Sequence, residues 1–139
     1  MAEDRFFELH IIAPERVFYE GKASMVELNT SEGEVGIYKN HIPMTLLIEP
    51  GIVTITEESG KKLAAIHSGF MEVLPTKVTI MAEVAEWPEE IDVNRAKEAE
   101  VRAERRLQMK DPMLNLNRAE IALRKAMVRL ELADTARNK

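Results

Sequence analysis

Glycine is confined to the first part of this 139-residue chain, and this distribution limits the possible folds most strongly. All six glycines and five of the six prolines occur by Pro88, whereas the 51 residues that follow contain no glycine. Because both residues favour turns and weaken helix interiors, short strands are expected first and helices afterwards. The charge changes at the same place: residues 1–88 carry 7 basic and 14 acidic side chains (net −7), and residues 89–139 carry 12 and 10 (net +2). Two domains are predicted, residues 1–87 and 88–139.

Length and composition argue against several classes of protein. The longest apolar runs, such as Leu46–Ile48, are far shorter than the roughly 20 residues needed to span a bilayer. The acidic N-terminus does not resemble a signal peptide, so a cytosolic protein is expected. The lack of cysteine rules out disulfides and thiolate metal sites, and the net charge of −5 argues against general nucleic-acid binding.

The first domain shows the sequence signals of short strands. Ser24–Asn29 alternates apolar and polar residues, as a half-buried strand does, and Ser31–Glu34 is typical of a turn. Turn residues at Glu58–Lys61 and Leu74–Thr76 predict two hairpins. About eight to ten short strands at this spacing favour an all-β fold, an antiparallel sandwich or barrel. The predicted strands are Phe6–Ile12, Val17–Tyr19, Ser24–Asn29, Ile52–Thr56, Lys62–Ile66, Phe70–Val73 and Lys77–Val84.

The second domain reads as an α-helical hairpin of two antiparallel helices. Asp92 is suited to cap a first helix that runs through Leu107, and Asp111–Pro112 interrupts the helical pattern. Asn117 followed by Glu120 resembles a capping box at the start of a second helix. Apolar side chains recur at helical spacing and predict the packing faces. They are Ala96, Ala99, Ala103 and Leu107 in the first helix, and Leu116, Leu123, Met127 and Leu130 in the second.

Each predicted helix also carries a basic face. Arginine or lysine recurs at spacings of 7 and 4, and between Arg102 and Arg129 there are 8 basic and only 3 acidic residues. A solvated surface explains most charged helix faces, but few local ion pairs offset the repulsion here. The planar guanidinium group suits carboxylates and phosphates, so either an acidic protein surface or a nucleotide is expected. The basic faces comprise Arg95, Arg102 and Arg106, and Arg118, Lys125 and Arg129.

Residue patterns of known catalytic and metal sites are missing from the sequence. His10, His41 and His67 are scattered over the first domain without metal-like spacing. The phosphate-binding loop G-x-x-x-x-G-K-[ST] does not occur, nor does G-x-S-x-G or H-E-x-x-H. We therefore expect a non-catalytic protein with no catalytic residue, no metal site and no required cofactor.

Four segments together resemble the epsilon subunits of bacterial F-type ATP synthases, over essentially the whole chain. The first three are SEGEVGIYKNHIPM (31–44), IEPG (48–51) and HSGFMEV (67–73), and the last is IDVNRAKEAEVRAERRL (91–107). At Ser68–Gly69 the family usually has two glycines, so Ser68 is a departure. The order of a β-sandwich followed by a helical hairpin also matches.

This resemblance implies a rotor subunit of the central stalk that couples proton transport to ATP synthesis and inhibits ATP hydrolysis. The sandwich would bind the gamma subunit and the c-ring, and Glu32, Glu34 and His41 would lie in one turn that meets the polar loops of the ring. The helices would extend into the alpha/beta hexamer, where Arg118, Arg124, Lys125 and Arg129 would contact an acidic segment of beta. The subunit would lie on the cytoplasmic side of the bacterial membrane, with no nucleic-acid contact and no direct insertion into lipid.

IDVNRA also matches the motif of epsilon subunits that bind ATP as a regulatory ligand. Cations of both helices would converge on the phosphates, and Lys125 stands where such relatives usually have arginine. The implied ATP-binding residues are Glu86, Ile91, Asp92, Arg95, Ala96, Arg102, Lys125 and Arg129.

Two other functions remain open at this point. A free-standing nucleotide sensor that regulates another enzyme would use the same basic faces. A small enzyme on a jelly-roll-like barrel would need clustered histidine and carboxylate ligands, which the three histidines do not offer. Co-purification with a gamma subunit separates the first alternative from an ATP synthase subunit.

Overall fold

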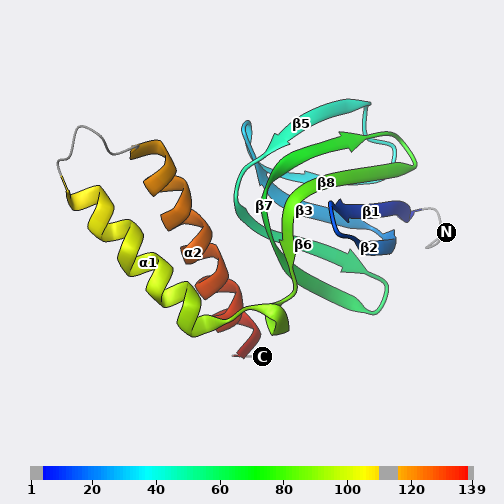
Figure 1. Ribbon diagram of the computed structural model, residues 1–139. Helices are drawn as coiled ribbons and strands as arrows, with labels where there is room; N and C mark the ends of the chain where they lie inside the picture. Colours follow the sequence, from blue (N-terminus) through cyan, green and yellow to red (C-terminus); the bar gives the residue numbers. More distant parts are fainter. Residues whose placement is uncertain (1–4, 110–115, 138–139) are drawn as a thin grey trace. The chain divides into compact units, whose positions relative to one another are not determined.

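The computed structural model describes residues 5–109 and 116–137, which divide into two units with the boundary along the chain between Glu86 and Trp87 (Figure 1). In these residues the first unit has eight strands and the second has two α-helices after a 3-10 turn. The strands are β1 (Phe7–Ala13), β2 (Arg16–Ala23), β3 (Met25–Thr30), β4 (Gly33–Ile37), β5 (Met44–Ile48), β6 (Gly51–Glu57), β7 (Gly60–Val73) and β8 (Lys77–Glu86). The turn is η2 (Pro88–Glu90), and the helices are α1 (Val93–Gln108) and α2 (Leu116–Arg137).

The strands form a sandwich, in the order β2-β1-β8-β7-β5-β3-β4, with β6 pairing with β3 and β7. The predicted fold class, a β-sandwich followed by two helices, is confirmed. The expectation of a wholly antiparallel sheet is wrong, because β1 runs parallel to β8, with Glu8 opposite Lys77 and Ile12 opposite Met81. Residues so far apart along the chain pair through the shared core, which local turn signals do not report.

Strand β7 is one continuous element of 14 residues, where two separate strands were predicted. Its first half pairs with β6, from Gly60 to Ile66, and its second half pairs with β5, from Gly69 to Val73. The backbone takes positive φ angles between these halves, 71° at Ser68 and 144° at Gly69. Because the register with β8 is the same on both sides, these residues turn the strand without ending it.

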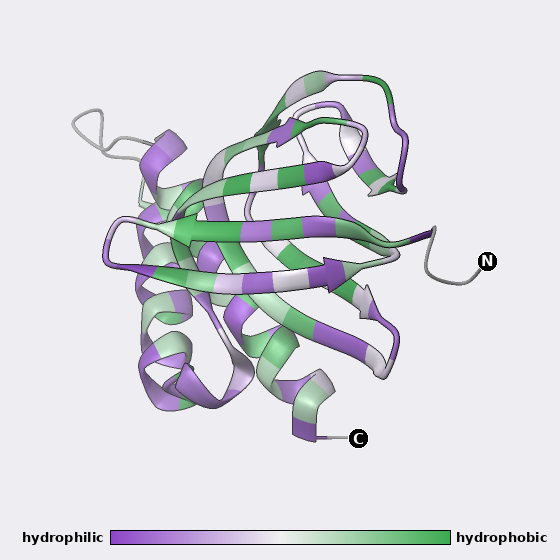
Figure 2. Cartoon of the chain, turned by 90° about the vertical axis from the view of Figure 1, so that its right-hand side faces the viewer, coloured by the Kyte–Doolittle hydropathy of each residue, from purple (hydrophilic) through white to green (hydrophobic). Residues whose placement is uncertain are grey.

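Apolar and polar residues alternate along the strands (Figure 2), and the apolar ones fill the sandwich interior. Leu9 and Ile11 of β1 and Val53 and Ile55 of β6 are completely buried. Strands β4 and β5 were not predicted, and Ser31–Glu34 was expected to be a turn throughout. Gly33 and Glu34 instead begin β4, because they pair with Thr30 and Asn29 of β3.

Helix α1 begins as predicted, with Asp92 as its N-cap residue. Ala96 and Ala103 of the predicted packing face are buried, and α1 and α2 pack against each other as an antiparallel pair (Figure 1). The predicted break at Asp111–Pro112 lies outside the described residues.

The apolar face predicted for the second helix is only partly correct. Met127 is 52% exposed, and Leu123 and Leu130 are partly exposed. The buried side chains of the described part of α2 are Ala119, Ala126, Val128 and Leu132 instead. Asn117 is not the N-cap, since α2 already begins at Leu116; the side chain of Leu116 lies outside the described part of the chain.

Candidate functional site

The segment that leads into α1 is fixed by hydrogen bonds of its own side chains. The backbone N–H of Trp87 donates to Glu90 Oε1 at 2.9 Å, and the N–H of Ile91 donates to the carbonyl oxygen of Pro88 at 3.2 Å. Asp92 Oδ1 then accepts from the backbone N–H of Arg95 at 3.1 Å. The carboxylate of Asp92 therefore stabilises the helix start, as an N-cap residue does.

Several basic residues of the two helices lie on the same side of the hairpin. Successive helix residues are about 100° apart, so Arg95 and Arg102 lie on one flank of α1, about 80° from its alanine stripe. Lys125 and Arg129 lie about 90° from the alanines of α2, in the same rotational sense. In an antiparallel pair of helices, residues that are rotated in the same direction away from the packing face lie on the same side of the pair. These cations therefore share one face of the hairpin. We call Arg95, Arg102, Arg118, Lys125 and Arg129 the basic flank.

The predicted ATP residues differ in their surroundings. Arg95 and Arg102 are exposed, Lys125 and Arg129 are partly exposed, and Ala96 is buried in the packing face. Glu86 belongs to the first unit, where its carboxylate accepts a hydrogen bond from His67. Arg124 immediately precedes Lys125, so helical geometry turns it about 100° away from Lys125 around α2.

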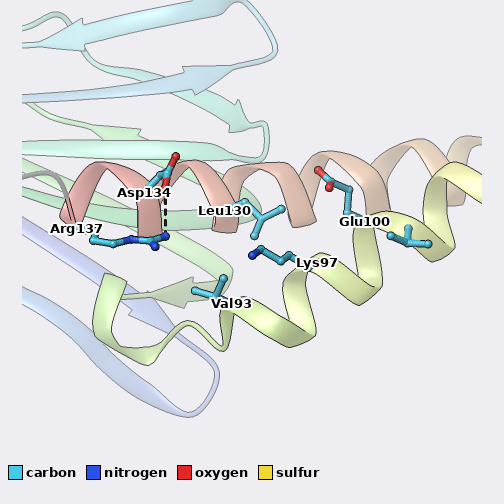
Figure 3. A pocket seen from close by; sticks show the side chains of 7 residues that line it. Val93, Lys97, Glu100, Leu130, Asp134 and Arg137 are labelled. Carbon is cyan, nitrogen blue, oxygen red and sulfur yellow. Dashed lines mark hydrogen bonds and ion pairs between the residues drawn. The ribbon is translucent and has the colours of Figure 1, made fainter.

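A cavity of about 550 Å³ opens between the helices (Figure 3). Its residue Lys97 lies on the flank of α1 opposite Arg95 and Arg102. The cavity wall mixes both charges with apolar surface, and the guanidinium group of Arg137 pairs with Asp134 at 3.2 Å. The lining residues are Val93, Lys97, Glu100 and Val101 of α1, and Leu130, Asp134 and Arg137 of α2.

The three residues expected to lie in one turn facing a c-ring are separated in the structure. Glu32 and Glu34 are exposed at the start of β4, where the N–H of Glu32 donates to Thr30 Oγ1 at 3.1 Å. His41 follows the other end of β4, in a segment fixed by a hydrogen bond from Asn40 N–H to the carbonyl oxygen of Pro75. The expectation of a single turn is wrong, because the strand Gly33–Ile37, which includes Glu34, lies between Glu32 and His41.

A continuous row of apolar side chains crosses the outer face of five strands, and sequence reasoning missed it. Leu47 of β5 is opposite Phe70 of β7, Phe70 is opposite Met81 of β8, and Met81 is opposite Ile12 of β1. Ile12 in turn is opposite Val17 of β2. Ile12 is partly exposed, and the other four are between 39% and 65% exposed. Each was visible only as an apolar residue in its own strand, because the row depends on the register between strands.

Carboxylates border this apolar row. The residues two positions away in these strands (three in β2, where the register with β1 shifts) form a second row on the same face, and they too lie opposite one another. Its carboxylates are Glu72 and Glu20, with His10 between them on β1, and Glu83 lies two residues beyond Met81 in β8. A large exposed apolar patch with a polar rim is typical of a protein-binding surface.

Two further features concern metals and membranes. In residues 5–109 and 116–137, no group of three or more histidine or acidic side chains is placed to hold a metal ion. Within the same residues, neither helix combines the length and apolar character that crossing a bilayer requires.

Both units match family models of one ATP synthase subunit. Residues 6–88 match the β-sandwich domain of the ATP synthase delta/epsilon chain, and residues 89–134 match its long α-helix domain. The chain belongs to the ATP synthase delta/epsilon family. The resemblance seen in the sequence is thereby confirmed, and membership makes the chain a subunit of an ATP synthase.

Relatives in this family resemble the chain along nearly its full length. The ATP synthase epsilon chain of Caldanaerobacter subterraneus is 43% identical over 131 residues, 94% of this chain and 95% of the relative. That of Halalkalibacterium halodurans is 44% identical over 126 residues, 90% of this chain and 95% of the relative.

A chain in a solved ATP synthase structure has a similar fold. A chain in the Euglena gracilis mitochondrial ATP synthase, from a structure of OSCP, F1 and the c-ring, superposes with a TM-score of 0.79 at 25% identity. The superposition covers 94% of this chain and 81% of the Euglena chain.

Proposed function

We propose that the chain is the non-catalytic epsilon subunit in the central stalk of an F-type ATP synthase, where it couples proton transport to ATP synthesis. Its family, the names of its relatives and its likeness to a chain solved together with F1 and a c-ring support this role. The subunit would lie peripherally on the cytoplasmic side of the membrane. Glu32, Glu34 and His41 remain candidates for the c-ring contact, from two places on the sandwich rather than one turn.

The apolar row of Leu47, Phe70, Met81, Ile12 and Val17 is the observation that carries the assembly role. Burial of a large apolar side chain stabilises a complex by about 1.5–3 kcal/mol, so five neighbours in one row form a strong docking surface. The carboxylates beside the row would favour a partner with basic side chains around an apolar ridge. Within the ATP synthase, we propose that this partner is the gamma subunit.

Charge substitutions in the row test this assignment. Phe70→Glu and Met81→Glu should abolish co-elution with the gamma subunit while circular dichroism and the melting temperature stay near wild type, since both side chains face outward. Thr54→Glu is the matched control, because Thr54 faces outward on β6, outside the row. Undiminished gamma binding by both row variants would place the docking surface elsewhere.

We further propose that the helical hairpin binds ATP as a regulatory ligand and inhibits hydrolysis when it extends into the hexamer. The shared basic flank supports both roles, because guanidinium groups bind phosphates and carboxylates with paired hydrogen bonds. Bound ATP would favour the compact hairpin by its higher affinity for that state. In the extended state, Arg118, Lys125 and Arg129, with Arg124 beside them, would contact an acidic segment of beta.

Variants on the two flanks separate these roles from general charge effects. Arg129→Gln should weaken ATP binding in calorimetric titrations, whereas Lys97→Gln, on the cavity flank, should not. The charge reversals Lys125→Glu and Arg129→Glu should relieve inhibition of hydrolysis in the reconstituted complex. Equal effects of substitutions on the two flanks would contradict a specific role for the basic one.

A further inference from the structure

One end of the sandwich is built from segments that are far apart in the sequence. The N–H of Asn40, in the loop between β4 and β5, donates to the carbonyl oxygen of Pro75, in the turn between β7 and β8, at 2.7 Å. The N–H of Glu8, near the start of β1, donates to the carbonyl oxygen of Thr76 at 3.0 Å. The end of β2 and the turn between β6 and β7 join the same end, on the right-hand side of the first unit in Figure 1.

Positive charge is concentrated at this end. Residues 1–88 contain seven basic side chains, and all except Arg16 belong to the segments just described. Four acidic side chains lie in or next to the same segments: Glu8, Glu57, Glu58 and Glu72. We call it the basic end, and its cations are Arg5, Lys22, Lys39, Lys61, Lys62 and Lys77. Only one pair of these opposite charges is close, Lys62 Nζ and Glu57 Oε1 at 3.6 Å, among the ion pairs of the described residues.

Large apolar side chains are exposed at the basic end as well. Ile42 is 71% exposed and Tyr38 is 61% exposed, both in the loop between β4 and β5, and Leu74 at the β7–β8 turn is 42% exposed. The hydrogen bond between Asn40 and Pro75 joins these two segments, so the three side chains lie on adjoining parts of the surface. Tyrosine and aliphatic side chains next to lysines suit the headgroup region of a bilayer, where apolar side chains enter and cations meet phosphates.

Carboxylates are concentrated at the opposite end of the strands. Glu15 lies in the β1–β2 turn, Glu32 in the β3–β4 turn and Glu49 directly after β5. Strand β1 has seven residues, which at about 3.3 Å per residue span roughly 20 Å. The Debye length at physiological ionic strength is about 8 Å. An anionic surface at the basic end is therefore attracted by the lysines and screened from the distant carboxylates, although the net charge of the chain is −5.

We propose that the basic end binds the anionic phospholipid headgroups of a membrane, with Tyr38, Ile42 and Leu74 entering only the headgroup region. The cations come from five separate segments and are spread over the whole end. A fluid lipid surface suits this arrangement, because single headgroups move to each cation, whereas a protein partner would need carboxylates at five matching positions. The lysines supply the attraction to the phosphates, and the apolar side chains add burial.

Flotation of the full chain with lipid vesicles tests the proposal. We expect binding at low ionic strength to vesicles of equal parts phosphatidylcholine and phosphatidylglycerol, and none to phosphatidylcholine alone. Added salt should weaken this binding, because it screens the lysines from the phosphates. Ile42→Ser should also weaken it, with the salt dependence unchanged, since this variant removes apolar contact but no charge.

Two substitutions of equal charge separate the basic end from the net charge of the chain. Glu58→Lys at the basic end and Glu15→Lys at the opposite end both replace an exposed carboxylate in a turn between strands. Glu58→Lys should strengthen binding to the anionic vesicles roughly tenfold, and Lys39→Glu should weaken it by a similar factor. Glu15→Lys should leave binding unchanged. Equal gains from both lysine substitutions would show that net charge alone acts, and would overturn the proposal.

Two further results would also overturn it. The first is that the wild-type chain does not bind anionic vesicles at low ionic strength. The second is salt-dependent binding to a detergent-solubilised c-ring, lost in Lys39→Glu, without binding to vesicles, which would assign the basic end to a protein partner. Co-elution with the gamma subunit should be unchanged in all these variants, because the apolar row lies on the outer face of the strands. Failure of lipid binding therefore leaves the proposed assembly role intact.

Discussion

The carbonyl oxygen of Met81 occupies the space into which a Cβ atom at Gly69 would project. Gly69 also has a φ of 144°, a conformation that other residues rarely adopt. The kink in β7 therefore requires glycine at this position for two separate reasons. Gly60 has a similar φ of 140°, but a Cβ atom there would meet no other atom within 4 Å, so only the conformational reason applies.

Gly69→Ala should therefore destabilise the sandwich more than Gly60→Ala. Backbone strain accounts for about 1–3 kcal/mol in both variants, and overpacking against β8 adds about 1–3 kcal/mol at position 69. The free energies of unfolding in urea, compared with wild type, measure the difference. Equal losses in the two variants would show that β8 moves aside without cost.

Ser68→Gly should stabilise the protein. A non-glycine residue at a φ of 71° carries a steric cost of about 1–2 kcal/mol, of which the greater flexibility of glycine in the unfolded chain offsets part. We expect a net gain of about 0.5–1 kcal/mol in the free energy of unfolding. Asn40→Gly is the control, because asparagine at its φ of 67° tolerates this conformation better and should gain less.

Two substitutions at Asp92 separate its capping role from its charge. Asp92→Ala should cost about 1 kcal/mol of hairpin stability, because the N–H of Arg95 loses its acceptor. Asp92→Asn retains an oxygen acceptor and should leave stability nearly unchanged. Hydrogen exchange of the first turn of α1 measures both effects, and equal exchange in the two variants would contradict the cap.

Tyr19 should make stability depend on pH in the alkaline range. Burial and the hydrogen bond that its hydroxyl donates to Glu57 raise the pKa of Tyr19 above its ordinary value near 10. The stabilisation is fully present below about pH 10 and decreases above it, because the unfolded chain then releases a proton that the folded chain retains. The difference in unfolding free energy between wild type and Tyr19→Phe should shrink as the pH rises past 10, and a constant difference would argue against this.

Lys125→Arg should increase the affinity for ATP. An arginine makes paired hydrogen bonds to phosphate oxygens, whereas lysine is a point charge, so we expect roughly a tenfold gain in calorimetric titrations. Lys97→Arg, on the cavity flank, is the matched control and should leave the affinity unchanged. No gain from Lys125→Arg would show that position 125 is not a phosphate ligand.

The sequence alone determined the features that depend on near neighbours in the chain. Glycine and proline up to Pro88 distinguish strands from helices because both residues act on their own backbone. The Asp92 cap was predictable, since an N-cap side chain bonds to a backbone group three residues away. The turns near Gly60 and Pro75 likewise indicated the β6–β7 and β7–β8 pairings.

Tertiary structure decided the features that depend on residues distant in sequence. The parallel pairing of β1 with β8 and the continuity of β7 arise from a shared core, and neither leaves a signal in a local window. The apolar row from Leu47 to Val17 exists only because the registers between neighbouring strands bring single outward residues into line. The basic flank and the hydrogen bond between His67 and Glu86 depend on packing between elements. The residues involved belong to different helices or strands and come together only when the chain has folded.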